Sequence, residues 1–339
     1  MVGNADRFLL LGPALAKVAS VGSDGLSIHD WDAPSDLVPM LTQAVPRADG
    51  SFLLSGAVDD FDGPHGWVGK VDPAWKLEWE TELEDARIFP GNLAGLSDDG
   101  AIFMSSLLPE NAANPGPTTD VVWTRLSSSG EVIWRQHVTF DAQGGGWMGL
   151  TSEPDPRIII VAADASSLVV GDLDSSYQIV PLQTSLTSLV SAAMLPNGRL
   201  ALVGHVGDNI GGRGQVHMTM LELDGTVVWE RDYGTGVDRG RTHVANGLVF
   251  NTARGELTLA GNNQLYGSWL LATTLDGEPT WELNRKQNPT NIDGEVWSVA
   301  ADKGPILDDL AVSPDGTLLA TGSSTQGLVY FVVGAGSCR

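Results

Sequence analysis

Apolar and polar positions along the chain form short repeated runs rather than helical periods. Runs of five to eight residues, rich in Val, Leu, Ile, Thr and aromatic residues, are bounded by turn sequences such as DG, NG and PDG. Such runs are typical of β-strands, and such turns are typical of hairpins. Because no long stretch has apolar residues at helical spacing, the pattern predicts an all-β protein.

The runs repeat as a unit of four parts. A turn that contains glycine is followed by an apolar run, which closes on Gly or a small residue six positions after that glycine. A second apolar run and a second turn follow, and the last part carries a tryptophan. These turn-and-run pairs occupy residues 47–56, 97–106, 195–204, 252–261 and 313–322. The recurring tryptophans are Trp79, Trp134, Trp229 and Trp281.

Four strands in a unit of about 50 residues are typical of a β-propeller blade. We therefore predict a single β-propeller domain over residues 1–339, with seven blades of about four antiparallel strands. Six or eight blades stay open, since the first unit lacks most of its innermost strand and the last lacks an outer strand. Either the native chain extends further upstream or one blade is short. The predicted repeats cover approximately residues 1–31, 44–83, 93–138, 147–182, 189–233, 244–283 and 306–339.

The recurring tryptophan has a structural explanation. On the outermost strand of a blade, its ring can fill the gap to the next blade and bury ~150–250 Å² of largely apolar surface. We therefore predict that these rings pack between blades and do not form a substrate platform.

The segments "LDGTVVWE" (223–230), "LDGEPTWE" (275–282) and "SSGEVIWR" (128–135) resemble the Trp-bearing repeat of the bacterial β-propellers known as PQQ-like. That group includes quinoprotein dehydrogenases and the scaffold propeller of outer-membrane protein assembly. Quinoprotein dehydrogenases are usually longer and eight-bladed, and the alcohol-oxidising branch carries adjacent cysteines, whereas this chain has only Cys338. The resemblance implies the fold and does not imply pyrroloquinoline quinone as a cofactor.

The net charge of the chain indicates which classes of binding partner are unfavourable. With 19 Lys and Arg against 42 Asp and Glu, the net charge is −23, which argues against nucleic acid and against an anionic membrane surface. Acidity serves solubility, and a calcium requirement or a cationic partner are the alternatives. No apolar run approaches the 18 residues of a membrane helix. We expect an exported protein, periplasmic or extracellular, with its signal absent from this chain, and a cytoplasmic location stays open.

Connection lengths predict which face of the propeller is functional. Within a blade, the first–second and third–fourth connections share one face and are mostly tight turns. The second–third and inter-blade connections share the other face and are long. Because long loops on a rigid scaffold carry function, we expect the ligand at this face, around the mouth of the central channel. The long connections are residues 57–66, 107–120, 205–215, 232–243 and 284–305.

Candidate ligating residues lie in or beside these loops. Several imidazoles together would suit zinc, copper or iron, although no fixed-spacing metal motif is present. The stretch "DDFDG" offers carboxylate oxygens for calcium, and a solvated acidic turn is the alternative. The candidate metal ligands are His65, His137, His205, His217 and His243, together with Asp59, Asp60 and Asp62.

Four further residues are candidates for ligand binding. Arg239 and Arg241 could hold a carboxylate or could pair with neighbouring Asp residues. Trp147 and Trp297 do not follow the blade repeat and are candidates for exposed aromatic contacts.

No nucleophile-elbow sequence is present, so this motif gives no indication of an enzyme. The first hypothesis is a non-catalytic propeller that binds a protein, peptide or glycan at its long-loop face. The second is a metal-assisted enzyme that uses loop histidines. The third, a quinoprotein oxidoreductase, depends on the resemblance alone.

Overall fold

The structure is a computed structural model. It describes residues 2–4, 7–11, 17–22, 25–30, 40–60, 63–98, 100–107, 119–140, 147–151, 156–174, 176–206, 216–233, 243–263, 267–284, 306–313, 315–324 and 327–333. Within these ranges, only the backbone is described for residues 2–30, 40, 59–60, 63–64, 84–91, 106–107, 119, 140, 243, 263, 267, 284, 306, 308 and 323–333.

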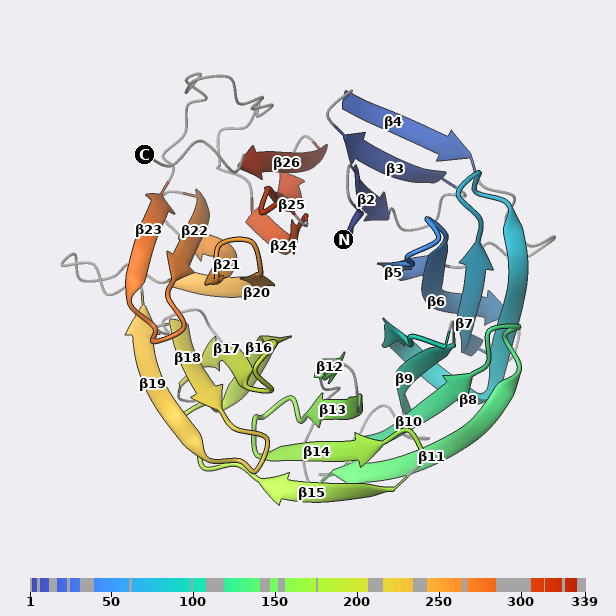
Figure 1. The fold of residues 1–339 in the computed structure, drawn as a ribbon, viewed down its shortest axis with the longest axis horizontal. Helices are drawn as coiled ribbons and strands as arrows, with labels where there is room; N and C mark the ends of the chain where they lie inside the picture. Colours follow the sequence, from blue (N-terminus) through green and yellow to red (C-terminus); the bar gives the residue numbers. More distant parts are fainter. Residues whose placement is uncertain are drawn as a thin grey trace. The chain divides into compact units, whose positions relative to one another are not determined.

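The described residues form 26 strands, arranged in antiparallel sheets whose members follow one another along the chain (Figure 1). The first sheet, β1-β2-β3-β4, comprises Val2–Asn4, Arg7–Leu11, Lys17–Gly22 and Gly25–Asp30. The second has seven strands, β5 to β11, at Met40–Pro46, Phe52–Asp60, Gly63–Val71, Leu77–Gly95, Ala101–Leu107, Thr119–Leu126 and Val132–Phe140.

The later sheets repeat the same meander. The sheet β12-β13-β14-β15 comprises Trp147–Leu150, Arg157–Val161, Ser167–Asp172 and Tyr177–Pro181. The sheet β16-β17-β18-β19 comprises Ser188–Met194, Leu200–His205, Val216–Leu221 and Val227–Tyr233. The sheet β20-β21-β22-β23 comprises His243–Asn251, Glu256–Asn263, Gly267–Thr273 and Pro279–Asn284. The sheet β24-β25-β26 comprises Ile306–Val312, Leu318–Ser324 and Gly327–Val333.

The seven-stranded sheet contains two repeats that share one strand. Residues Leu77 to Leu83 of β8 pair with β7, and residues Ile88 to Gly95 pair with β9. The 19-residue strand β8 is therefore the fourth strand of one repeat and the first strand of the next. Counted in this way, the described strands make seven repeats, as the sequence predicts.

The ends of the repeat series differ from each other. The sequence predicts a first unit without most of its innermost strand, and β1 has only three residues, which pair with β2 through Val2 and Leu9. The innermost strand is therefore present but short, in agreement with the prediction. The last sheet has three strands among the described residues, as predicted.

Tight turns join the first to the second strand and the third to the fourth strand. In the turn between β18 and β19, Gly225 N donates to Glu222 O at 3.0 Å, and Glu222 N donates to Thr226 O at 2.9 Å. Gly225 has a φ of 86°, which glycine adopts without steric cost and which suits a three-residue hairpin loop. Asp224 accepts a hydrogen bond from Thr226 N at 2.9 Å, and this bond lowers the pKa of Asp224. Asp49, Asp174 and Asp315 close their turns in the same way.

The recurring tryptophans pack against the following repeat, which confirms the predicted role. Trp134 Nε1 donates to Leu173 O at 2.9 Å, and Trp229 Nε1 donates to Leu275 O at 2.9 Å. Both acceptors lie in the tight turn before the fourth strand of the next sheet. A Cβ at Gly130, in the corresponding turn after β10, would lie 2.6 Å from the Trp79 ring. Glycine in that turn therefore lets the ring approach.

The chain divides into two compact units, Met1–Ala163 with Val169–Ile179, and Asp164–Leu168 with Val180–Arg339. The prediction of a single domain stays a prediction. In the part of the chain that the structure describes, no helix is long and apolar enough to cross a bilayer.

Candidate functional site

Each sheet has a turn end, which holds its first–second and third–fourth connections, and a loop end, which holds its second–third and inter-sheet connections. The long connection predicted at residues 57–66 is wrong, because β6 extends to Asp60 and β7 begins at Gly63. In the sheet β16–β19, strand β17 ends at His205 and strand β18 begins at Val216, which is the cross-strand partner of His205. Strand β19 ends at Tyr233 before the next long connection. His205 and His217 therefore lie at the loop end, where the sequence predicts them.

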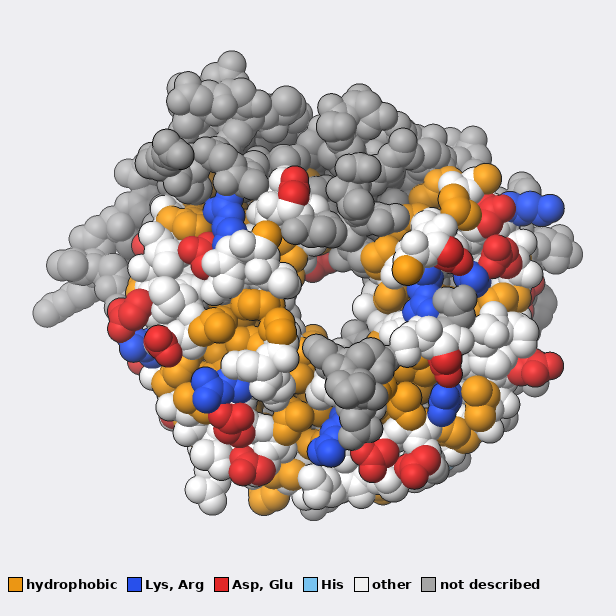
Figure 2. Space-filling model, in the orientation of Figure 1, with side chains coloured by type: hydrophobic (Ala, Val, Ile, Leu, Met, Phe, Trp, Pro, Cys, Tyr) orange, Lys and Arg blue, Asp and Glu red, His pale blue; other side chains and the backbone are white. Residues whose placement is uncertain are grey.

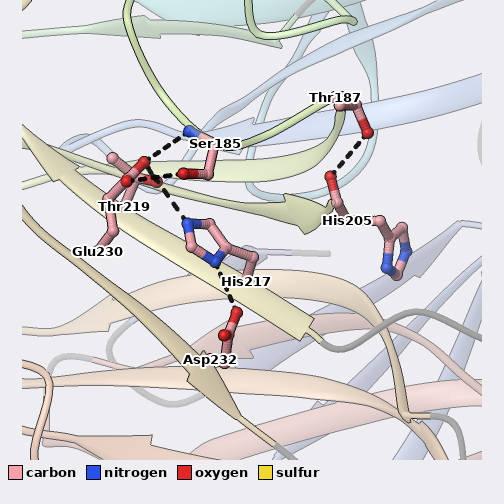
Figure 3. A network of polar contacts seen from close by, with 7 residues as sticks. All are labelled: Ser185, Thr187, His205, His217, Thr219, Glu230 and Asp232. Carbon is pink, nitrogen blue, oxygen red and sulfur yellow. Dashed lines mark hydrogen bonds and ion pairs between the residues drawn. The ribbon is translucent and has the colours of Figure 1, made fainter. Parts of the chain in front are cut away.

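His217 is the centre of a polar network at this loop end (Figure 3). Its side chain is 7% exposed, and its Nδ1 lies 2.7 Å from Asp232 Oδ1. On the other side of the ring, Nε2 lies 3.5 Å from Glu230 Oε1. Glu230 and Asp232 are two positions apart on β19, so both project to the same face of the strand. An imidazole can donate from both nitrogens only when it is protonated, and here a carboxylate faces each nitrogen.

Glu230 connects the network to the chain before β16. It accepts hydrogen bonds from Ser185 N at 2.8 Å, Ser185 Oγ at 3.0 Å and Thr219 Oγ1 at 3.2 Å. Burial raises the pKa of Glu230, but the Ser185 hydrogen bonds, the charge of His217 and the Thr219 hydroxyl outweigh it, so the pKa lies below its usual value. Glu230 is therefore ionised at neutral pH.

The position of His217 in the repeat is occupied by tryptophan in two other sheets. Trp67 Nε1 donates to Glu80 at 3.0 Å, and Trp269 Nε1 donates to Glu282 at 2.8 Å. In each pair the glutamate comes 13 residues after the aromatic residue, which is also the separation of His217 and Glu230.

In all three repeats, the glutamate directly follows the packing tryptophan. The dipeptide Trp-Glu at 79–80, 229–230 and 281–282 is the sequence signal that could have identified Glu230. The sequence analysis missed it, together with Ser185 and Asp232. No comparable signal marks Ser185, which lies between two strands.

Three other predicted histidines, His65, His137 and His205, have described side chains. The ring of His205 lies apart from that of His217 (Figure 3). His65 on β7 is half-buried, and His137 on β11 is exposed. Among the described residues, no group of three or more His, Cys, Asp or Glu side chains could hold a metal ion.

Several predicted residues cannot be compared with the structure. The side chains of His243, Asp59 and Asp60 are outside the description, although their backbones lie in β20 and β6. Asp62, Arg239, Arg241 and Trp297 lie outside the described residues altogether. The predicted metal and binding roles of all these residues stay predictions.

Trp147 begins β12 and is partly buried. Its ring folds over Gly149 of its own strand, so closely that a Cβ there would meet the ring. Part of the ring is therefore used in packing, and its predicted role as a binding contact stays a prediction.

No protein-family model matches the sequence, and no curated protein matches it either. Solved structures do. The WD40 β-propeller domain of Doa1 has a TM-score of 0.62 at 10% identity, over 99% of this chain and 92% of that one. A streptogramin B lyase has a TM-score of 0.59 at 11% identity, over 98% and 91% of the two chains. The fold is a β-propeller.

A third propeller neighbour is an α-L-arabinofuranosidase from Fusarium graminearum, with a TM-score of 0.54 at 12% identity, over 89% of this chain and 96% of that one. Identities this low show the fold alone. The neighbours include two proteins named as enzymes and one named as a WD40 domain, so the propeller fold does not decide the activity.

Proposed function

We propose that this protein is a non-catalytic binding β-propeller that holds a cationic segment of a protein or peptide at the loop ends of its sheets. The observation that carries the proposal is the group of long connections at the loop ends, which follow β9, β17 and β19. At the turn end, carboxylates such as Asp49 and Asp224 accept hydrogen bonds that close three-residue turns. At the loop end, Asp164 closes one short turn in the same way, but the connections after β9, β17 and β19 are long, which is typical of binding loops on a rigid scaffold.

Charge supports a cationic ligand. The net charge is −23, and the exposed carboxylates at loop ends include Glu82 and Asp120. Asp and Glu side chains on the face shown in Figure 2 stand mostly one or two at a time. The attraction would therefore come from the summed field of the protein, which speeds encounter with a cation and disfavours anionic partners.

Isothermal titration calorimetry with three 12-residue peptides, one rich in Lys and Arg, one rich in Glu and one uncharged, tests this function. We expect heat of binding from the basic peptide alone, with an affinity that falls as salt rises, because exposed charges are screened. Equal binding of all three peptides, or none by the basic peptide, would overturn the proposal. Binding of uncharged glycans in its place would assign the loop ends to another ligand class.

Two variants of one hairpin separate the ends. Asp120 lies at the loop end of β10, and Glu131 lies in the tight turn between β10 and β11. Asp120→Asn keeps an acceptor for the Thr139 hydroxyl, which donates to Asp120 at 2.6 Å. We expect Asp120→Asn to weaken binding of the basic peptide and Glu131→Gln to leave it unchanged. The reverse order would place the ligand at the turn end.

The other hypotheses stay predictions. Elemental mass spectrometry on protein purified without a metal-affinity step addresses the metal-assisted enzyme. Near-stoichiometric zinc, copper or iron would favour the enzyme, and calcium would direct attention to Asp59, Asp60 and Asp62. Membership of the PQQ-like group and export from the cytoplasm likewise stay predictions.

A further inference from the structure

The connection between β15 and β16 is a loop-end connection whose residues are all described. We call residues 182–187 the Ser185 linker. Leu182 N donates to Ser166 O at 2.8 Å, and Thr187 N donates to His205 O at 2.9 Å, so backbone bonds hold both ends. The middle is held by Ser185, whose N and Oγ both donate to Glu230 of β19. Attachment of the middle of the linker therefore depends on where the Glu230 carboxylate points.

Glu230 is positioned by charge as well as by its donors. It lies beside His217 Nε2, a buried nitrogen that has no hydrogen-bond partner among the described residues. Histidine is the side chain whose charge changes within the physiological pH range. With its proton, His217 attracts the carboxylates on both sides. Without it, one nitrogen presents a lone pair to a carboxylate, and Glu230 and Asp232 repel each other across two positions of β19.

From this geometry we propose that His217 makes the Ser185 linker a proton-controlled latch. When His217 is protonated, Glu230 is drawn inward and fastens Ser185. When the proton leaves, Glu230, whose side chain is 25% exposed, turns toward water and releases the linker. The latch itself does not depend on the proposed function, but its consequence does: ligand binding at this loop end would change with pH.

The groups that face His217 support this assignment. Among the described residues, the titratable groups facing its ring are Glu230 and Asp232, both on β19. The Ser185 linker contributes a hydroxyl and an amide, which do not titrate in this range. Strand β17, which pairs with β18, carries His205, whose ring lies apart from that of His217 (Figure 3).

The sheet β20–β23 shows what the same position does without a titrating group. There Trp269, whose indole does not titrate, donates its N–H to Glu282. His217→Trp would therefore put the donor found in two sister repeats beside Glu230, and it would remove the proton dependence while keeping a donor. His217→Gln serves as a second variant that is smaller than tryptophan and also uncharged.

Amide hydrogen exchange of the Ser185 linker tests the latch without any ligand. Protection factors, corrected for the intrinsic pH dependence of exchange, are compared at about pH 5.5 and pH 8, on either side of histidine titration. In the wild type, we expect protection of the linker amides to fall by about tenfold at the higher pH, because the charge that draws Glu230 inward is lost. Protection in the turn at residues 274–278 should not change.

In both His217→Trp and His217→Gln, the linker should lose this pH dependence. A wild-type linker whose protection is the same at both pH values would overturn the proposal, and so would a pH dependence that survives in both variants. Calorimetry with the basic peptide at the same two pH values keeps the proposals separate. If the latch behaves as expected and the peptide does not bind, only the proposed function fails; if the peptide binds and the linker does not respond, only the latch fails.

Discussion

Two sheets of the same repeat, β16–β19 and β20–β23, show how one position can serve different purposes. Both have a glutamate directly after the packing tryptophan and an aromatic side chain 13 residues earlier that faces it. In β20–β23 the aromatic side chain is Trp269, which is fully buried and forms a 2.8 Å hydrogen bond with Glu282. In β16–β19 it is His217, and the contact becomes a charge-dependent pair at 3.5 Å.

The cross-strand neighbour differs as well. Trp269 is opposite Asn284, whereas His217 is opposite Asp232, which takes the second ring nitrogen at 2.7 Å. Histidine and aspartate thus occur together where the sister sheet has tryptophan and asparagine. The glutamate is thus common to both sheets and belongs to the scaffold. The residue that faces it determines the contact: Trp269 gives a buried packing contact, and His217 gives a contact that depends on charge.

The largest difference between the two sheets should appear when the facing residue is truncated. Trp269→Ala removes a fully buried ring from the core and should lower the free energy of unfolding by about 3–5 kcal/mol. His217→Ala removes a smaller polar ring and should cost about 1–3 kcal/mol. Urea unfolding at pH 7 measures both values. Equal losses of unfolding free energy would mean that the two side chains contribute equally to stability, which would contradict the comparison.

Neutralising the glutamates should reverse the order of the two sheets. Glu230→Gln removes the charge that serves Ser185, Thr219 and His217, and should cost about 1–3 kcal/mol. Glu282→Gln keeps an acceptor for the Trp269 indole and should cost about 1 kcal/mol or less. The same unfolding measurement applies, and a larger cost for Glu282→Gln would contradict the comparison.

The packing tryptophans offer a smaller contrast. Trp229→Phe removes the hydrogen bond to Leu275 O and should cost about 1 kcal/mol beyond the change in packing. Trp281 Nε1 is buried without a hydrogen-bond partner among the described residues, so Trp281→Phe should be closer to neutral. The measurement is the thermal unfolding midpoint of each variant, compared with that of the wild type. A costlier Trp281→Phe would indicate that ring shape matters more than the indole N–H.

The smallest expected effect on the free energy of unfolding is that of acid on individual carboxylates. Burial raises the pKa of Glu230, but its donors outweigh this and hold the pKa below the usual value. The pKa of Asp315 is lowered by hydrogen bonds from Ser313 and Thr317. A carboxyl with a depressed folded pKa contributes stability that is present above its unfolded pKa and lost as pH falls.

Chemical unfolding should therefore show constant contributions from these groups near pH 7 and a decline below about pH 4, the range in which unfolded Asp and Glu titrate. Glu230→Gln and Asp315→Asn should each make that decline shallower. If either variant leaves the acid profile unchanged, that carboxylate does not contribute through its charge.

Much of the fold could be predicted from sequence because its signals are local. The spacing from turn glycine to closing residue and from turn glycine to tryptophan describes hairpins and a packing ring, and both appear in the structure. Strand β8 could not be predicted, since Pro90 and Gly91 usually interrupt strands. The ladder to β9 shifts register between Phe89 and Asn92, so Pro90 and Gly91 lie at an irregularity within a strand that pairs on both sides of it. Such an irregularity is not visible in the sequence.

The candidate site could be predicted only in part. His217 was identifiable as a histidine beside a long connection, but its partners depend on strand register, which places Asp232 and Glu230 against one ring. The repeated Trp-Glu dipeptide encodes that register, whereas the Ser185 contact crosses 45 residues to a linker without any repeat signature. Contacts of that kind arise from packing between elements and leave no local pattern.

The shared strand β8 also has a consequence for engineering. Between other repeats, the chain leaves one sheet before it enters the next. An inserted domain or a new pair of termini there would interrupt a connecting segment and would not break the hydrogen bonds between paired strands. Between β7 and β9 the same insertion would cut a strand that is hydrogen-bonded on both halves. A split-protein reporter or a circular permutant built on this propeller should therefore tolerate almost any repeat boundary better than the one inside β8.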